Sequence, residues 1–230
     1  MKKTLTLLVF VLASTFAFNV QAQEEASSSF DTGVDIYSSY IWRGAKFGSG
    51  PAFQPYVEFS TGDFALGAWG SVSSSTDEGY EMDLYASYSA GPVSFTLTDY
   101  YFGGDWTEFK TMHSLEPSVA LSAGDFSFTA AYMFLAGMDD DPSTIGDESA
   151  DFGEEGDTYL EAGYSFSSVD VFLGAGDGQY TDDGDFNICN IGVGTSKEVK
   201  LTDSFSLPVS GAVILNPSTG GFFITVGISL

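Results

Sequence analysis

Alternation of apolar and polar residues over short segments is the feature that most restricts how this chain can fold. In residues 30 to 43, most apolar side chains share one face, and Asp, Gly, Ser, Tyr and Arg side chains share the other. A period of two is that of a β-strand with one apolar side. The pattern recurs in twelve segments, and Gly, Asp, Ser or Pro turns separate many of them. The expected apolar faces lie within 30–42, 53–59, 64–72, 82–88, 93–97, 115–121, 126–134, 160–166, 169–175, 189–193, 205–213 and 222–230.

A soluble β-sandwich also alternates, so the composition of the two faces has to decide between a sandwich and a membrane barrel. The apolar faces are nearly free of charge, and several aromatic residues fall towards strand ends, where the interfacial girdles of a barrel lie. The opposite faces carry carboxylates with many Ser, Thr and Tyr, which suits a polar lumen. The last segment, "FFITVGISL", is expected to pair with the first strand. The sequence therefore predicts an all-β, closed antiparallel transmembrane β-barrel of about twelve strands.

Connection lengths alternate along the chain. The connections "TGD", "SAGP", "SAGD" and "SSVD" are short, whereas 44–51, 74–79, 103–112, 137–158 and 176–185 are longer. Short periplasmic turns and longer extracellular loops are typical of outer-membrane barrels. The connection around "SKEVK" is longer than its place on the short side predicts.

The N-terminus is typical of an exported protein. Residues 1–22 combine a basic start, an apolar run from Leu5 to Phe18 and a small-residue site at Val20-Gln21-Ala22, which predicts a cleaved signal peptide. An uncleaved anchor is the alternative, but the apolar run is short for one. We expect a short periplasmic segment at 23–29, a barrel at 30–230 and localisation in the outer membrane of a Gram-negative cell. Cys189 is the single cysteine, so it has no intrachain disulfide partner, and we expect it to pack as a small apolar residue.

The charge of the chain restricts its partners. The chain has seven basic and 32 acidic residues, and its formal net charge is −25. Nucleic-acid binding needs a basic patch, so we expect no nucleic-acid partner. Small cations would be attracted instead.

Polar and bulky side chains on the faces opposite the apolar ones are the candidate lumen residues. The candidate pore-lining residues are Asp35, Tyr37, Arg43, Glu58, Trp69, Glu81, Asp83, Tyr85, Tyr100, Glu116 and Glu161. Their carboxylates would concentrate cations and repel anions. Four bulky members would form a constriction, namely Tyr37, Trp69, Tyr85 and Tyr100. An acid and base pair of the glycosidase kind is the alternative use of the carboxylates.

Arg43 is a rare cation in "YSSYIWRG", residues 37 to 44. The alternation places Tyr40 and Trp42 outward at the membrane interface and Arg43 inward, at the top of the first strand. We expect its guanidinium to pair with a lumen or loop carboxylate, Glu58 or Glu81 in the first instance.

His113 is the only histidine, and it shares a face with Leu115 and Val119. That face predicts an outward position near the extracellular rim. Pairing of 93–97 with 115–119 would put Asp99 opposite His113, as a cross-strand pair. A Ser-His hydrolase is the alternative, but it needs an exposed histidine beside a serine and an acid. We expect no catalytic residue and no enzymatic activity.

Acidic residues also cluster in two loops. The 137–158 loop could bind divalent cations such as Ca²⁺, alone or together with lipopolysaccharide, and a merely solvated loop is the alternative. Its spacing matches no calcium loop, and "YTDDGDF", with Asp182, Asp183 and Asp185, lacks the downstream glutamate of an EF-hand. The sequence predicts no cofactor and no resident metal site.

One stretch resembles a known family. "YSSYIWRG", followed by "GPAFQPYVEFSTGDFALGAWGS", is similar to the TorF-like porin family, whose members carry S-x-Y-x-[FW]-R-G near the mature N-terminus. The resemblance is specific over residues 36–70 and architectural afterwards. Ser39 stands where an acidic residue is common in the family.

The resemblance implies an outer-membrane barrel with a channel role and no established catalytic residues. We therefore expect passive diffusion of small polar or cationic solutes. The alternatives are a plugged barrel that is structural or binds a ligand or lipopolysaccharide, and a lipid-modifying barrel enzyme.

Overall fold

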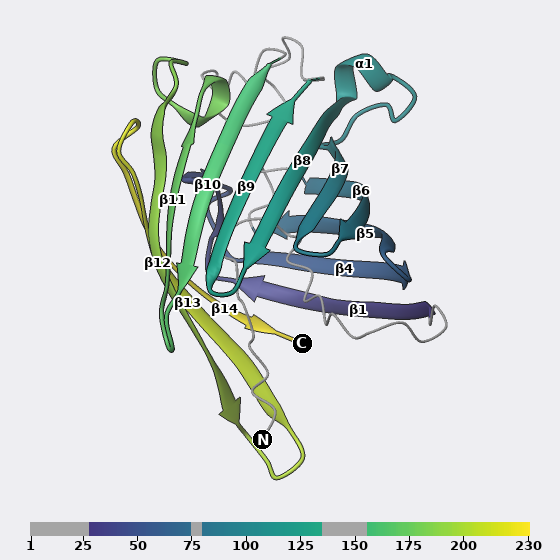
Figure 1. Ribbon diagram of the computed structural model, residues 1–230, viewed down its shortest axis with the longest axis vertical. Coiled ribbons are helices and arrows are strands. Elements are labelled where there is room, and N and C mark those ends of the chain that lie inside the picture. Colours follow the sequence, from purple (N-terminus) through teal and green to yellow (C-terminus); the bar gives the residue numbers. More distant parts are fainter. Residues whose placement is uncertain (1–27, 75–79, 135–155) are drawn as a thin grey trace.

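Twelve strands form a closed antiparallel barrel in the computed structural model (Figure 1). The structure describes residues 28–74, 80–134 and 156–230. The predicted signal peptide and nearly all of the acidic 137–158 loop therefore lie outside the described residues. The barrel strands are β1 (Ser28–Tyr37), β4 (Ala52–Thr61), β5 (Phe64–Ser73), β6 (Tyr80–Ala90), β7 (Val93–Tyr101), β8 (His113–Ala123), β9 (Phe126–Met133), β10 (Asp157–Ser165), β11 (Asp170–Gly176), β12 (Asn187–Lys200), β13 (Ser206–Asn216) and β14 (Gly221–Ser229).

Each strand pairs with its neighbour in the chain, and β1 pairs with β14 to close the ring. The predicted fold class, with twelve strands and antiparallel closure, is confirmed. The remaining elements are β2 (Tyr40–Trp42), β3 (Ala45–Phe47), the single-turn helix α1 (Phe109–Met112) and the 3₁₀ turn η1 (Gly178–Tyr180). Neither helical element in the described part of the chain has the length and apolar character to cross a membrane.

The barrel wall is apolar outside and polar inside. Outward side chains such as Phe30, Phe222 and Ile224 are 70%, 62% and 63% exposed. Inward carboxylates such as Glu81 and Glu116 are buried. Because side chains alternate across a strand, the two faces of one wall segment carry opposite polarity.

The connection around "SKEVK" has a structural explanation. Strand β12 pairs with β13 as far as Lys200 and Ser206. Its other neighbour, β11, pairs with it only up to Gly194, and β14 reaches β13 only at Val209. Residues 195–208 therefore project beyond the barrel as a two-stranded hairpin, seen at the bottom of Figure 1. The connection itself is short, because the strands continue into what the sequence suggested was a loop.

A β-bulge changes the face on which Cys189 lies. The register between β11 and β12 shifts so that Gly174 pairs with Asn190 while Ala175 pairs with Ile188. The extra residue is Cys189, which is fully buried in the cluster of Trp42 and Tyr180. The expected packing as a small apolar residue is confirmed. Its expected place on the apolar face with Ile191 is wrong, since Ile188 takes the outward position.

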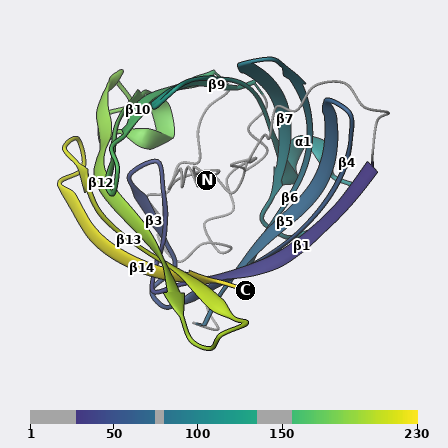
Figure 2. The ribbon, with the colours of Figure 1, turned by 60° about the horizontal axis from the view of Figure 1, so that its bottom comes forward.

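The largest difference from the sequence analysis concerns the first strand, which ends at Tyr37 rather than continuing to Trp42. The chain then turns inward, and β2 and β3 form a separate hairpin within the ring of strands (Figure 2). Tyr40 pairs with Phe47 and Trp42 pairs with Ala45. Tyr40 and Trp42 therefore lie inside the barrel, and the expectation that they face the membrane interface is wrong.

The tip of this hairpin is a two-residue turn of Arg43 and Gly44. Their φ angles are +49° and +83°, and positive φ at both positions is what a type I′ hairpin turn requires. A Cβ atom on Gly44 would meet the backbone carbonyl of Cys189. Glycine is thus needed here both for the backbone conformation and for the close approach of β12.

We predict that Gly44→Ala destabilises the barrel more than Gly220→Ala does. Both glycines have positive φ, but a Cβ on Gly220 meets nothing within 4 Å. Gly220→Ala should lower the free energy of unfolding by about 1 kcal/mol, the cost of left-handed backbone. Gly44→Ala should cost about 3 kcal/mol, because overpacking against Cys189 is added. Urea unfolding of the detergent-folded protein measures both, and equal losses would show that the hairpin tip tolerates the extra atom.

Candidate functional site in the barrel lumen

The inward hairpin contacts both sides of the bore. On one face, the Tyr40 ring lies 5.6 Å from that of Trp69 on β5, and the Trp42 ring lies 5.8 Å from that of Tyr100 on β7. On the other face, Ile41 packs with residues of β11 and β13. Its buried partners there are Phe172, Ala212 and Ile214. The hairpin therefore crosses the lumen and does not merely line one wall.

Arg43 at the hairpin tip forms a buried, bidentate ion pair. Its Nη1 donates to Glu116 Oε2 at 2.5 Å, and its Nη2 donates to Glu116 Oε1 at 2.8 Å. Nη1 also donates to the Tyr180 hydroxyl at 2.5 Å. Arg43 is 0% exposed and Glu116 is 1% exposed. The expected inward arginine is therefore paired with a lumen carboxylate, but the partner is Glu116 and not Glu58 or Glu81.

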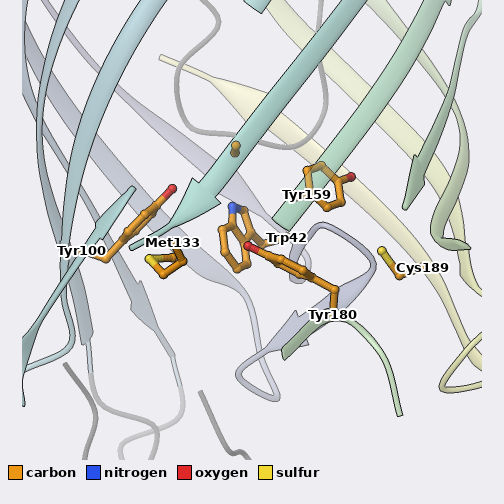
Figure 3. Close-up of a cluster of buried hydrophobic side chains, with 7 residues drawn as sticks. Trp42, Tyr100, Met133, Tyr159, Tyr180 and Cys189 are labelled. Carbon is orange, nitrogen blue, oxygen red and sulfur yellow. The ribbon is translucent and has the colours of Figure 1, made fainter. Parts of the chain in front are cut away.

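Aromatic rings surround the guanidinium, and several of them are drawn in Figure 3. The guanidinium carbon of Arg43 lies 4.5 Å from the ring centroid of Trp42 and 4.4 Å from that of Tyr159. Stacking on ring faces stabilises a cation that has lost its water. Tyr100 also donates to Glu116, at 3.1 Å. Side chains from β7, β8, β10 and η1 thus meet at one buried charge.

A second carboxylate, Glu161, is satisfied by neutral donors beside this cluster. The Tyr159 hydroxyl donates to Glu161 Oε2 at 2.5 Å, and Asn190 Nδ2 donates to the same oxygen at 2.9 Å. Asn190 is fully buried, and it follows the bulge at Cys189. The bulge therefore places an amide where it can stabilise a lumen carboxylate.

Two further lumen carboxylates, Glu81 and Asp83, have no cation beside them among the described residues. Glu81 and Asp83 both point inward from β6 and are 8% and 5% exposed. The Tyr40 hydroxyl hydrogen-bonds to Glu81, whereas Asp83 Oδ1 has no hydrogen-bond partner. Neither carboxylate belongs to an ion pair among the described residues. A cavity of about 20 Å³ lies beside Glu81, with walls that include Trp42, Phe47, Tyr100 and Phe102.

The other candidate pore-lining residues lie on inward faces of the wall. Tyr85 donates to Glu58 Oε2 at 3.1 Å, and Trp69 is buried against Tyr40. Asp35 and Tyr37 occupy inward positions near the end of β1.

The sequence analysis missed residues that fill the lumen, namely Tyr40, Trp42, Phe47, Tyr159, Tyr180 and Asn190. The one signal for the hairpin was the Arg-Gly pair between aromatic residues, because a glycine after a non-glycine residue is compatible with a type I′ turn.

His113 forms the expected pair with Asp99 at the loop end of the outer wall. His113 Nδ1 lies 2.9 and 3.0 Å from the two Asp99 carboxylate oxygens, and Nε2 lies 3.1 Å from the carbonyl oxygen of Trp106. The register differs by two residues from the expected one, since Tyr101 is opposite His113 and Asp99 is opposite Leu115. His113 is fully buried, so its expected exposure to the lipid interface is wrong.

The segment between β7 and β8 covers this histidine. The rings of Trp106 and Phe109 lie 4.4 and 4.6 Å from the imidazole of His113. The backbone amide and hydroxyl of Thr107 donate to Asp105 and lower the pKa of its carboxyl group. These contacts fold the segment back over the outer wall.

The acidic loops give no metal site within the described residues. Asp182, Asp183 and Asp185 lie in the described part, and no group of three or more metal-ligating side chains occurs there. Asp157, at the end of the predicted acidic loop, is instead buried in β10 and accepts a hydrogen bond from the backbone amide of Gln179.

Among known proteins, the chain is similar to solved outer-membrane proteins. No family model matches the chain, and no curated protein matches it. A mutant of the Rh. blastica porin is similar with a TM-score of 0.42 and 15% identity, over 78% of this chain and 55% of the porin. The chain thus spans about half the length of the porin that it matches.

Outer-membrane phospholipases are similar to the same degree. The Escherichia coli phospholipase A has a TM-score of 0.42 and 12% identity, over 86% of this chain and 88% of the enzyme. The Salmonella typhi phospholipase dimer with bound calcium has a TM-score of 0.43 and 14% identity over the same shares.

We predict strong coupling between Arg43 and Glu116. Arg43→Met or Glu116→Gln alone should lower the free energy of unfolding by about 3 kcal/mol, because each leaves a buried polar group without its partner. The double variant should lose roughly 2 kcal/mol less than the sum of the two losses. Urea unfolding in detergent measures the cycle.

The matched control for this cycle is the exposed pair of Lys200 and Asp203, whose side chains are 64% and 103% exposed. Lys200→Met should leave the unfolding midpoint unchanged. Additive losses at Arg43 and Glu116 would contradict a dependence of the hairpin on this ion pair.

Proposed function

We propose that the chain is an outer-membrane barrel that passes small polar or cationic solutes by diffusion past the inward hairpin. The reversal of polarity across the wall is the observation that carries this proposal. Soluble monomers rarely expose apolar patches of more than a few hundred Å², whereas here exposed Phe, Leu, Val and Ile side chains recur on every barrel strand except β10, which contributes an exposed Tyr. Such a surface suits lipid, and a closed sheet leaves few unpaired backbone groups within it.

The negative charge of the lumen side chains supports cations rather than anions as the solutes. Carboxylates from β4, β6, β8 and β10 point inward, and Arg43 is held by Glu116. A narrow acidic passage raises the local concentration of cations and repels anions. The resemblance of "YSSYIWRG" to the TorF-like porins supports a channel role independently, and we propose membership of that family.

A plugged barrel is the second candidate, and a specific observation favours it. Arg43, Tyr159, Tyr180, Cys189 and Asn190 are all at most 1% exposed, so the middle of the lumen is packed like a protein core. Such a barrel would act through its loops, by contact with lipopolysaccharide or a surface ligand.

The proposal gives His113 a structural role rather than a catalytic one. Both of its ring nitrogens face acceptors, in Asp99 and Trp106. A general base needs one free nitrogen beside a nucleophile.

We predict small, cation-selective conductance steps for the protein in planar bilayers. Replacement of residues 40–47 by a short Gly-Ser linker should raise the conductance several-fold, because the hairpin crosses the bore. The matched control shortens the projecting hairpin at 197–205, which lies outside the barrel, and should leave the conductance unchanged.

Three results would each contradict one part of this proposal. Silence of both the parent and the hairpin replacement, with heat-modifiable gel mobility, would leave the plugged barrel. Anion selectivity would contradict the acidic passage. Solubility in plain buffer, without folding in detergent, would overturn the membrane assignment itself.

A further inference from the structure

We propose that Glu81, Asp83 and the neighbouring aromatic cavity form a binding site for one ammonium group, either free ammonium or the head of a primary amine. The inference rests on the proposed function only in requiring that ions reach the lumen. It goes further in naming a site within the lumen and the chemistry of its ligand.

The two carboxylates lack a counter-charge among the described residues. Residues at i and i+2 of a strand lie about 7 Å apart on the same face, so Glu81 and Asp83 are neighbours inside the barrel. Two buried carboxylates repel one another strongly, because little solvent screens them. The buried guanidinium is already engaged in a bidentate pair with Glu116. A cation between Glu81 and Asp83 would relieve the repulsion.

The free oxygen of Asp83 points to a missing donor. Asp83 Oδ1 is buried and has no hydrogen-bond partner in the part of the chain that the structure describes. The nearest phenol in the strand register, that of Tyr100 on β7, donates to Glu116 instead. Buried polar atoms in native proteins are nearly always hydrogen-bonded, so an unmatched carboxylate oxygen suggests a bound donor. An ammonium group carries three or four N–H donors and would satisfy it.

The cavity restricts the size and type of cation. Its volume of about 20 Å³ suits one or two water-sized groups. Ammonium or a terminal CH₂–NH₃⁺ group has one or two heavy atoms. Trp42, Phe47, Tyr100 and Phe102 in the cavity walls offer ring faces, which attract an organic or ammonium cation.

Divalent cations suit this site less well. Ca²⁺ takes six to eight oxygen ligands, and Mg²⁺ requires near-ideal octahedral geometry. No group of three or more metal-ligating side chains is present among residues 28–74, 80–134 and 156–230. Glu81 lies in the aromatic wall of the cavity, and Asp83 follows two residues along the same strand face, so the site favours a monovalent cation with its own N–H donors.

Trp42 provides the measurement, because it lines the cavity. The detergent-folded protein is titrated with methylammonium chloride at constant ionic strength, with sodium chloride as the balancing salt, and tryptophan fluorescence is followed. A Trp106→Phe background removes the signal of the exposed rim tryptophan. We expect a saturable change with methylammonium and none with tetramethylammonium, which is too large for the cavity.

Charge-removing variants test the assignment of the two carboxylates. Glu81→Gln and Asp83→Asn should each weaken methylammonium binding by about tenfold or more, because each removes one of two attractive charges. Both should still fold, as shown by heat-modifiable mobility, since each also removes a repulsion. The matched control is Glu58→Gln, which removes another lumen carboxylate that already accepts a hydrogen bond from Tyr85, and it should bind as the parent does.

Other outcomes overturn the site. No saturable change would indicate that the two carboxylates share a proton rather than a cation. Equal weakening in Glu58→Gln would indicate general attraction to an acidic lumen, and equal competition by magnesium chloride would contradict an ammonium site. Saturable binding in a protein that conducts no ions would contradict the channel and leave the site intact. Conductance without saturable binding would overturn the site alone.

Discussion

The buried guanidinium of Arg43 is the interaction on which the interior of this barrel depends. Removing such a charge from water costs several kcal/mol unless hydrogen bonds and an opposite charge replace the lost solvation. Glu116 supplies both, and aromatic rings of Trp42 and Tyr159 cover the remaining surface. These groups come from strands far apart in the sequence. One charge therefore ties the hairpin to β8 and β10 and fixes where the hairpin crosses the bore.

The lumen carboxylates fall into two groups that differ in their partners. Glu116 is paired with the guanidinium, and Glu161 accepts hydrogen bonds from Tyr159 and Asn190. Glu81 and Asp83 receive no cation from the described chain. Trp42 stacks on the paired guanidinium and also lines the cavity beside Glu81.

Periodicity predicted the wall but not the lumen. Alternation reports which face of a strand a side chain takes, and this was enough to predict a closed barrel with its outward apolar faces. Alternation does not report which sheet a strand joins. The alternating pattern continues from Phe30 to Trp42, so it did not reveal that the chain bends at Ser38 and enters a second sheet. The bulge at Cys189 was hidden for a related reason, because an extra residue changes the parity of the pattern without changing its composition. The His113 and Asp99 pair was predictable because a shift of two residues keeps both on one face.

The turn at Arg43 and Gly44 shows why these separate features belong together. A non-glycine residue at positive φ costs about 1 to 2 kcal/mol, and Asn or Gly would be less strained at this position. The bidentate ion pair with Glu116 and the stacking on Trp42 and Tyr159 are the contacts that can offset this cost. Gly44 then permits the tip to approach the carbonyl of Cys189, which is the extra residue of the bulge. Turn, ion pair and bulge are therefore parts of one arrangement. The "WRG" sequence contributes the turn and the arginine to it, and the other parts come from distant strands.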